Sequence, residues 1–246
     1  MAVKYKNDPI HEALCEFRFA SPGMWNLTIP GRMHDRLSAE YSGEPREVKK
    51  LETKITAEEN DEASVAVQQS LDRVQLPDAK NTKILAVGPG VLSIHSLAPY
   101  DGWKNFKPRI LTALTTLFSI SGEQPVTRIG LRYINRVAVE QPELDPKPYF
   151  SITPFERHPI GGNPTNFGCR VEYLLPTRMK LVVTYSALPK KSLLSEFVLD
   201  LDVIWDLHPL TAFQDVAQMI EQMHAEEGKA FEVLITNEAR RIFNGA

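Results

Sequence analysis

The chain has 246 residues, 43% of them hydrophobic and 24% charged, which is ordinary for a soluble globular protein with a sizeable core. Its formal net charge of -3 gives no reason to expect a surface that binds nucleic acid in general. No apolar run approaches the roughly 20 residues that a membrane-spanning helix needs, and the first residues lack the apolar segment of a signal peptide.

The chain contains two cysteines, Cys15 and Cys169, and both fall at apolar positions of strand-like segments. Such cysteines are typically buried free thiols in a reducing compartment and not a disulfide pair. We therefore expect a cytoplasmic protein. The length allows one large domain or two small ones.

The first half of the chain predicts a strand, a helix, a run of strands and a second helix. Alternating apolar and polar residues indicate the first strand over 12–20, and a helix with Thr28 as its N-cap is expected over 28–41. Antiparallel strands are expected near 48–55, 64–76, 82–88 and 91–97. A second helix, which we expect Asp101 to cap, carries an apolar stripe over 103–118.

The second half begins with the longest alternating stretch of the chain, Val126–Glu140. A loop rich in Pro and Gly follows over 141–165. Apolar residues then share one side of three further strands, expected at 166–175, 178–187 and 194–206. A helical region follows Pro209 and reaches Phe243. Each half thus runs as strand, connection, antiparallel meander and helix.

This order of elements predicts an α+β fold of two related antiparallel sheets flanked by helices. We expect residues 1–124 to form the N-terminal half and residues 125–246 the C-terminal half, packed as one compact body. An internal duplication would account for the similar order. The alternative is that helices cover one-sided sheets in both halves for the same physical reason.

Four short motifs carry a resemblance to a known family. They are PIHEA at 9–13 with EFRF at 16–19, PY at 99–100 with GW at 102–103 and Phe106, RIGLRYINR at 128–136, and LDLD at 199–202. Over nearly its whole length the chain resembles a sporadically distributed bacterial family of uncharacterised proteins with the motifs P-x-x-E-A-x-x-E-x-R-F and G-L-R-Y-I-N-R. The resemblance implies patchy inheritance, which is common among defence and mobile-element genes. It implies no activity, cofactor or catalytic residue.

The strands also predict a second, charged face. Arg128, Arg132 and Arg136 alternate with the packed residues of the central strand, and Glu16 and Arg18 do so in the first strand. These five residues are the candidate ligand-binding residues, because the planar fork of arginine binds phosphate and carboxylate groups bidentately. The alternative is a solvent-exposed face on which acids and bases of neighbouring strands form ion pairs.

Asp200 and Asp202 are weak candidates for a metal site. They share one face of a strand, so their carboxylates are placed to hold Mg²⁺ together with Glu172 or Glu196. Pairing with the arginines of the central strand explains the two acids without a metal. We therefore expect neither a metal nor another cofactor.

No catalytic motif is recognisable, since G-x-S-x-G, Walker A, G-x-G-x-x-G and H-E-x-x-H are all absent. We therefore expect a non-catalytic binding or partner module, and the resemblance implies that it belongs to a bacterial accessory system of a defence-related kind. The alternative is an enzyme that acts on a phosphate-containing ligand through the Arg/Asp face, and a third interpretation is a structural subunit of an oligomer. The expected partner is another protein or further copies of this chain, with an anionic small molecule as a further candidate. Nucleic acid and membrane are not expected.

Overall fold

The computed structural model describes residues 4–20, 25–56, 64–141, 144–152, 165–188 and 194–245. In chain order its elements are β1 (Ile10–Phe19), α1 (Ile29–Leu37), β2 (Arg46–Thr56), β3 (Ser64–Pro77), β4 (Lys83–Gly88), β5 (Val91–Leu97), α2 (Trp103–Ser121), β6 (Val126–Glu140), β7 (Gly168–Leu174), β8 (Lys180–Ala187), β9 (Leu194–Trp205), α3 (Phe213–Leu234) and α4 (Asn237–Asn244).

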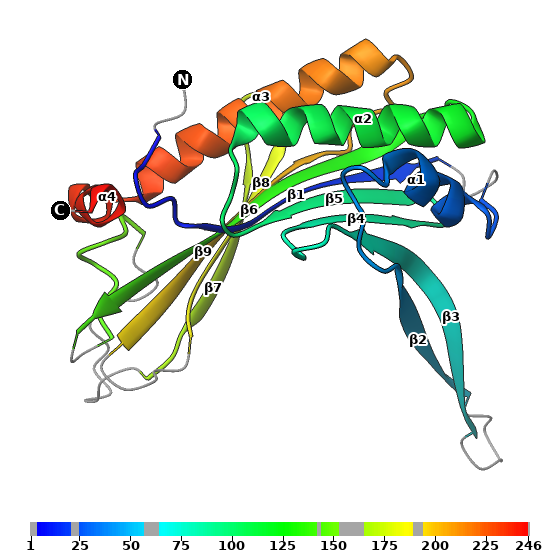
Figure 1. Ribbon diagram of the computed structural model, residues 1–246. Coiled ribbons are helices and arrows are strands. Elements are labelled where there is room, and N and C mark those ends of the chain that lie inside the picture. The colour runs from blue at the N-terminus through cyan, green and yellow to red at the C-terminus, as the bar shows by residue number, and fades with distance from the viewer. Residues whose placement is uncertain are drawn as a thin grey trace.

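The nine strands of the described chain form a single antiparallel sheet in the order β2-β3-β4-β5-β1-β6-β9-β8-β7. β1 is the middle strand and pairs with β5 on one side and β6 on the other, so that Cys15 stands between Ile94 and Leu131. The sheet bends, and its two ends fall away from the helices (Figure 1).

The mixed class of helix and strand and the antiparallel pairing expected from the sequence are confirmed, but the expectation of two separate sheets is wrong. β1 and β6, the first strands of the two halves, pair with each other from Ile10 opposite Asn135 to Phe19 opposite Val126. Pairing closes two strand edges that separate sheets would leave open. On either side of this β1–β6 seam lies a three-stranded meander, β5-β4-β3 in one half and β9-β8-β7 in the other.

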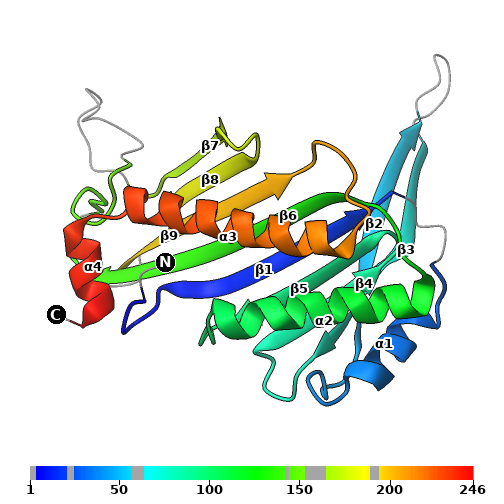
Figure 2. The same cartoon turned by 90° about the horizontal axis from the view of Figure 1, so that it is seen from above.

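The two long helices α2 and α3 cover the same face of the sheet (Figures 1 and 2). That face carries the apolar residues of the alternating strands, among them Phe17, Leu131, Tyr133 and Leu201, all of which are buried. The helices bury their own apolar stripes against it: Phe106, Ile110 and Leu114 in α2, and Val216, Ile220 and Met223 in α3. Full burial of such a side chain contributes about 1.5–3 kcal/mol, so this layer holds the fold together. α1 packs against α2.

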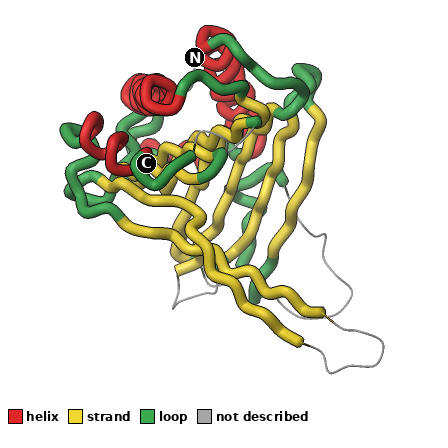
Figure 3. The backbone as a smooth tube through the Cα atoms, turned by 90° about the vertical axis from the view of Figure 1, so that its right-hand side faces the viewer, coloured by secondary structure: helices red, strands yellow, loops and turns green. Residues whose placement is uncertain are grey.

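The two edges of the sheet differ. β3 pairs with β4 only from Val74 to Pro77, so the outer part of β3 pairs with β2 alone. This two-stranded ribbon extends away from the body (Figures 1 and 3). β7 forms the opposite edge and pairs along its whole length with β8.

Several local expectations need correction. Asp101 does not cap α2: the N-cap is Gly102, and the Asp101 carboxylate bonds to Arg109 instead. Thr28 holds the N-cap position of α1 without a side-chain hydrogen bond. The last helical region divides into two helices, but not at Gly228, where the sequence suggests a break: α3 continues through that residue, Ile235 is extended, and the Thr236 hydroxyl caps α4 by accepting a hydrogen bond from the Ala239 N–H.

Both cysteines are free, as the sequence predicts, but they differ in burial. Cys15 is fully buried in the middle strand, whereas Cys169 is only half-buried because β7 is an edge strand. In the described part of the chain, none of the helices combines the length and the apolar character that crossing a membrane requires.

Candidate functional site

The sheet face opposite α2 and α3 is not covered by any described helix (Figure 1). The alternation of the strands places charged residues there: Glu12, Glu16 and Arg18 from β1, Arg128, Arg132 and Arg136 from β6, and Glu196, Asp200 and Asp202 from β9. We call this the open face. The sequence alternation determines which residues lie on the open face, because successive side chains of a strand point to opposite faces and the neighbouring residues pack against the helices.

Arg132 and Asp200 form the tightest ion pair of the open face. The Arg132 Nε donates to Oδ1 of Asp200 at 2.7 Å, and Nη2 donates to Oδ2 at 2.5 Å. The Asp200 side chain is 10% exposed and that of Arg132 41%. The hydrogen bond to Asp200 raises the pKa of Arg132. The contact is diagonal, since the register places Arg132 opposite Asp202. Both oxygens of Asp200 are therefore occupied, and the pair acts as a brace between β6 and β9.

A different arrangement surrounds Glu16, where three arginines share one carboxylate. Arg18 Nε donates to Oε1 of Glu16 at 2.9 Å, and Arg73 Nη1 donates to Oε2 at 3.3 Å. Arg128 Nη1 lies 3.5 Å from Oε1. We call these four residues the Glu16 cluster. It brings together guanidinium groups from β1, β3 and β6.

Arg73 reaches the cluster because β3 passes close to the end of β4. At Gly88, a Cβ atom would lie only 2.2 Å from the carbonyl oxygen of Asp72 and 3.1 Å from the Cα of Arg73. Only glycine permits this approach of the two backbones. The Arg73 Nε also donates to Oδ2 of Asp72 at 2.7 Å, which orients its guanidinium.

Arg128 is the least firmly held member of the cluster. Within the described residues its side chain makes no hydrogen bond, and its nearest acids are Glu16 at 3.5 Å and Asp202 at 3.9 Å. The guanidinium lies beside Gly130, where a Cβ would be 3.4 Å from Nη1. Its direct cross-strand neighbour is Arg18. Like charges opposite each other are unfavourable, so this pair of arginines is suited to an added anion.

Asp202 lies between the brace and the cluster. Burial raises the pKa of its carboxyl to about 6, although Arg128 and Arg132 act to lower it. The two arginines do not offset the desolvation, because Arg132 bonds Asp200 and Arg128 remains 3.9 Å away. Asp202 is thus a carboxyl group that changes charge near neutral pH on the open face.

The remaining charged groups lie further along the strands. Arg136 is 4.0 Å from Glu196 and takes no part in the cluster. Glu12 contacts Nδ1 of His95 at 2.7 Å, and this hydrogen bond lowers the pKa of Glu12. Of the five candidate binding residues, the structure therefore joins Arg18, Arg128 and Glu16, engages Arg132 elsewhere and separates Arg136.

Within the part of the chain that the structure describes, Asp200 and Asp202 are not joined by the further ligands that a metal would need. Glu172 pairs with Arg170 on β7, and Glu196 lies near Arg136. Across the described ranges, no three His, Cys, Asp or Glu side chains are grouped so that they could hold a metal ion.

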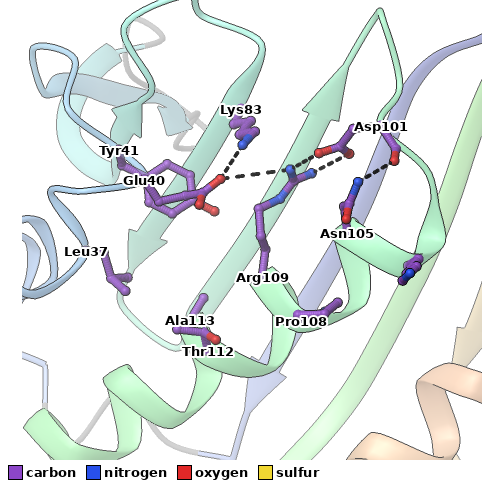
Figure 4. Close-up of a pocket in the computed structure, with 11 residues that line it drawn as sticks. Leu37, Glu40, Tyr41, Lys83, Asp101, Asn105, Pro108, Arg109, Thr112 and Ala113 are labelled. Atoms are coloured by element: carbon purple, nitrogen blue, oxygen red, sulfur yellow. Dashed lines mark hydrogen bonds and ion pairs between the residues drawn. The ribbon is translucent and has the colours of Figure 1, made fainter.

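A pocket of ≈470 Å³ lies away from the open face, between the end of α1, β4 and α2 (Figure 4). Arg109 on its wall donates to both oxygens of Asp101, at 2.5 and 3.1 Å, and Lys83 pairs with Glu40. The buried hydroxyl of Tyr41 and the buried Nε of Arg109 have no hydrogen-bond partner in the described part of the chain. Two of the cations that line the pocket, Lys83 and Arg109, are thus each paired with an acid.

Two further arginines that form ion pairs at these sites, Arg73 and Arg109, were not predicted from the sequence. Arg73 falls on the open-face parity of β3, because it lies two residues from Gln75, which pairs with Ala86. That parity was a usable signal. Arg109 lies within the apolar stripe of α2, where nothing marks it as the partner of Asp101 eight residues earlier.

No protein-family model matches the chain, and no curated protein matches it by sequence.

Proposed function

We propose that this protein is a non-catalytic binding module that takes an anionic group of its ligand or partner at the Glu16 cluster. The observation that carries the proposal is that three guanidiniums gather around one carboxylate while Arg128 makes no hydrogen bond within the described residues. A phosphate group fits this arrangement best, because its oxygens accept bidentate hydrogen bonds from several arginines at once.

The surroundings of the cluster support binding without chemistry. The described contacts of the Glu16 cluster join arginines to acids, with no nucleophile beside a general base. A hydrogen-bonded chain of Ser93, His95 and Glu12 does lie on the same face, with Ser93 Oγ 3.0 Å from Nε2 of His95 and Nδ1 of His95 2.7 Å from Oε1 of Glu12. Ser93 is only 1% exposed, so its hydroxyl is closed to a ligand in this structure. Oriented guanidiniums alone can hold an oxyanion, whereas catalysis would need a group that moves a proton or attacks.

One observation favours a second candidate function, an enzyme that acts on a phosphate-containing ligand. Asp202, with its pKa raised to about 6 by burial, lies 3.9 Å from Arg128 and is placed to exchange a proton near a bound phosphate. Release of inorganic phosphate from pyrophosphate or ATP by the purified protein, and its loss in Asp202→Asn, would support this candidate over the first.

The binding proposal is tested by calorimetry and thermal melts with sulfate and pyrophosphate as probes. We expect both anions to bind and to raise the melting temperature of the unmodified protein. Arg128→Gln should abolish the effect. Arg136→Gln is the matched control, because Arg136 lies on the same strand and the same face but outside the cluster, and it should keep the effect. If neither sulfate nor pyrophosphate changes the melting temperature of the unmodified protein, the proposal is overturned.

The proposal also covers the kind of system to which the module belongs and the partner that it binds. The resemblance to a sporadically distributed bacterial family favours an accessory system of a defence-related kind, with a protein partner or further copies of this chain. Two free thiols fit a reducing, cytoplasmic environment. The arrangement of a meander on each side of the β1–β6 seam, and of one long helix per half, supports an internal duplication of one α+β unit.

A further inference from the structure

Among the described residues, nothing pairs with the backbone groups along the outer edge of β7. Ala187 N donates to the Phe167 oxygen at 3.1 Å, and Leu175 N donates to the Met179 oxygen at 2.9 Å, just outside the two ends of β7. Hydrogen-bonded pairs alternate in an antiparallel ladder, so the odd-numbered residues of β7 bond to β8. The even-numbered residues 168, 170, 172 and 174 therefore direct their N–H and C=O groups to the free edge, with which no described strand pairs.

The side chains of this edge are unusually apolar for an exposed strand. Leu174 is 78% exposed and Tyr173 43% exposed, and Val171 is only half-buried. Proteins usually protect such an edge with like charges, proline or a bulge. β7 carries one arginine and one glutamate, Arg170 and Glu172, which now pair with each other within the strand at 2.5 Å.

This charge pattern is complementary to itself when the strand is reversed. Two copies of β7 paired about a two-fold axis must place even-numbered residues opposite even-numbered ones, since those have the free backbone groups. Centred on Val171, the pairing sets Arg170 of each copy opposite Glu172 of the other and Gly168 opposite Leu174. Moving the centre to residue 170 or 172 instead sets two arginines or two glutamates opposite each other, which is unfavourable.

We propose that two copies of this chain join through β7, antiparallel and centred on Val171, so that the two sheets continue as one. The dimer satisfies the outward N–H and C=O groups of Arg170, Glu172, Gly168 and Leu174 in both copies. It also places Tyr173 of each copy opposite Cys169 of the other, on the helix-bearing side. This inference uses residues outside the Glu16 cluster and stands whether or not that cluster binds an anion.

The register is tested by cross-linking in a Cys169→Ser background. The two Val171 positions would form a non-hydrogen-bonded pair, with Cα atoms about 4.5 Å apart, which is within the range that a disulfide spans. We expect added Val171→Cys to give a covalent dimer on mild oxidation. Added Glu172→Cys is the control, since its two copies would be offset diagonally, roughly 8 Å apart and beyond disulfide reach. Cross-linking at 172 and not at 171 would overturn the register.

The association itself is tested by analytical ultracentrifugation of charge variants. Arg170→Glu and Glu172→Arg should each weaken the dimer about tenfold or more, because each creates two like-charge contacts across the axis. The double variant Arg170→Glu/Glu172→Arg should restore it, which also shows that the single variants had not simply unfolded. Lys49→Glu on β2, at the opposite edge of the sheet, should leave association unchanged. A monomeric parent, or a double variant as weak as the singles, would overturn the proposal.

Discussion

The Arg132–Asp200 pair and the Glu16 cluster share the open face of one sheet, yet their arginines are held in opposite ways. In the first, one guanidinium bonds both oxygens of a buried carboxylate. In the second, one carboxylate is contacted by three guanidiniums, the loosest of them at 3.5 Å. The Arg132 guanidinium is matched by a carboxylate of its own, whereas three guanidiniums share Glu16, so an added anion gains more at the cluster than beside Arg132. On the same strand, the difference separates Arg132, held by two hydrogen bonds to one carboxylate, from Arg128, held among the described residues by looser contacts to two acids.

Asp200 and Asp202 differ in the same way, since one carboxylate is bonded by an arginine and the other is not. They lie two residues apart on β9 and face the same way, but only Asp200 has an arginine bonded to it. The raised pKa of Asp202 is the consequence of being buried without such a bond.

The largest effect is expected at the brace. Arg132→Gln should lower the free energy of unfolding by about 2–4 kcal/mol, because it leaves the buried carboxylate of Asp200 without its partner. Asp200→Asn should cost less, about 1–2 kcal/mol, since the orphaned arginine is partly exposed and can be hydrated. Urea denaturation of both variants and of the double variant gives the coupling. Single costs that simply add would show that the two side chains are independent and would contradict the brace.

The next effect is a pH dependence at Asp202. Its pKa of about 6 in the folded protein lies above the ordinary value of 3.8, so the folded state favours the protonated form. Protonated Asp202 therefore contributes to the free energy of unfolding. This contribution is complete below pH 3.8 and is lost as the pH rises through 6, a difference of at most about 3 kcal/mol. Asp202→Asn, which stays neutral, should therefore gain about 1–3 kcal/mol over the unmodified protein between pH 4 and pH 8. Denaturation at both pH values checks this, and a constant difference would show that Asp202 titrates normally.

A smaller effect is expected when the shared acid is removed. Glu16→Gln should destabilise the protein by about 1 kcal/mol, because three neighbouring guanidiniums lose a partly exposed counter-ion. The same change should tighten sulfate binding, since the cluster then carries more positive charge. Calorimetric titration with sulfate, whose charge does not change near neutral pH, measures this change in affinity. Weaker sulfate binding in Glu16→Gln would mean that Glu16 orients the arginines more than it neutralises them.

The sequence predicts the open face well, because alternation alone decides which side of a strand a residue occupies. Arg18, Arg128, Arg132 and Asp200 all lie where their parity places them. The sequence predicts poorly which acid each arginine bonds, because a long side chain can reach a residue two positions along the neighbouring strand from the one directly opposite. Arg132 stands opposite Asp202 in the register but bonds Asp200.

The single sheet was missed for a related reason. Periodicity identifies β1 and β6 as strands with one packed face, but it carries no information on which strand edges meet. The pairing of Leu14 with Arg132 joins residues more than a hundred positions apart, and no local signal marks it. Arg73 was missed because its place in the cluster depends on the close approach of β3 to Gly88.

The smallest effect on stability is expected at Arg128. This variant gives the most direct contrast between the Glu16 cluster and the Arg132–Asp200 pair. Arg128→Gln should change the free energy of unfolding by no more than about 0.5 kcal/mol, because the side chain makes no hydrogen bond within the described residues and stands opposite Arg18. Arg132→Gln, four residues along the same face, provides the contrast, since it is expected to destabilise strongly. Urea denaturation of the two variants at low salt is sufficient. If Arg128→Gln costs as much as Arg132→Gln, then Glu16 and Asp202 hold Arg128 as firmly as Asp200 holds Arg132. The Glu16 cluster would then be a second brace and not a site for an anion.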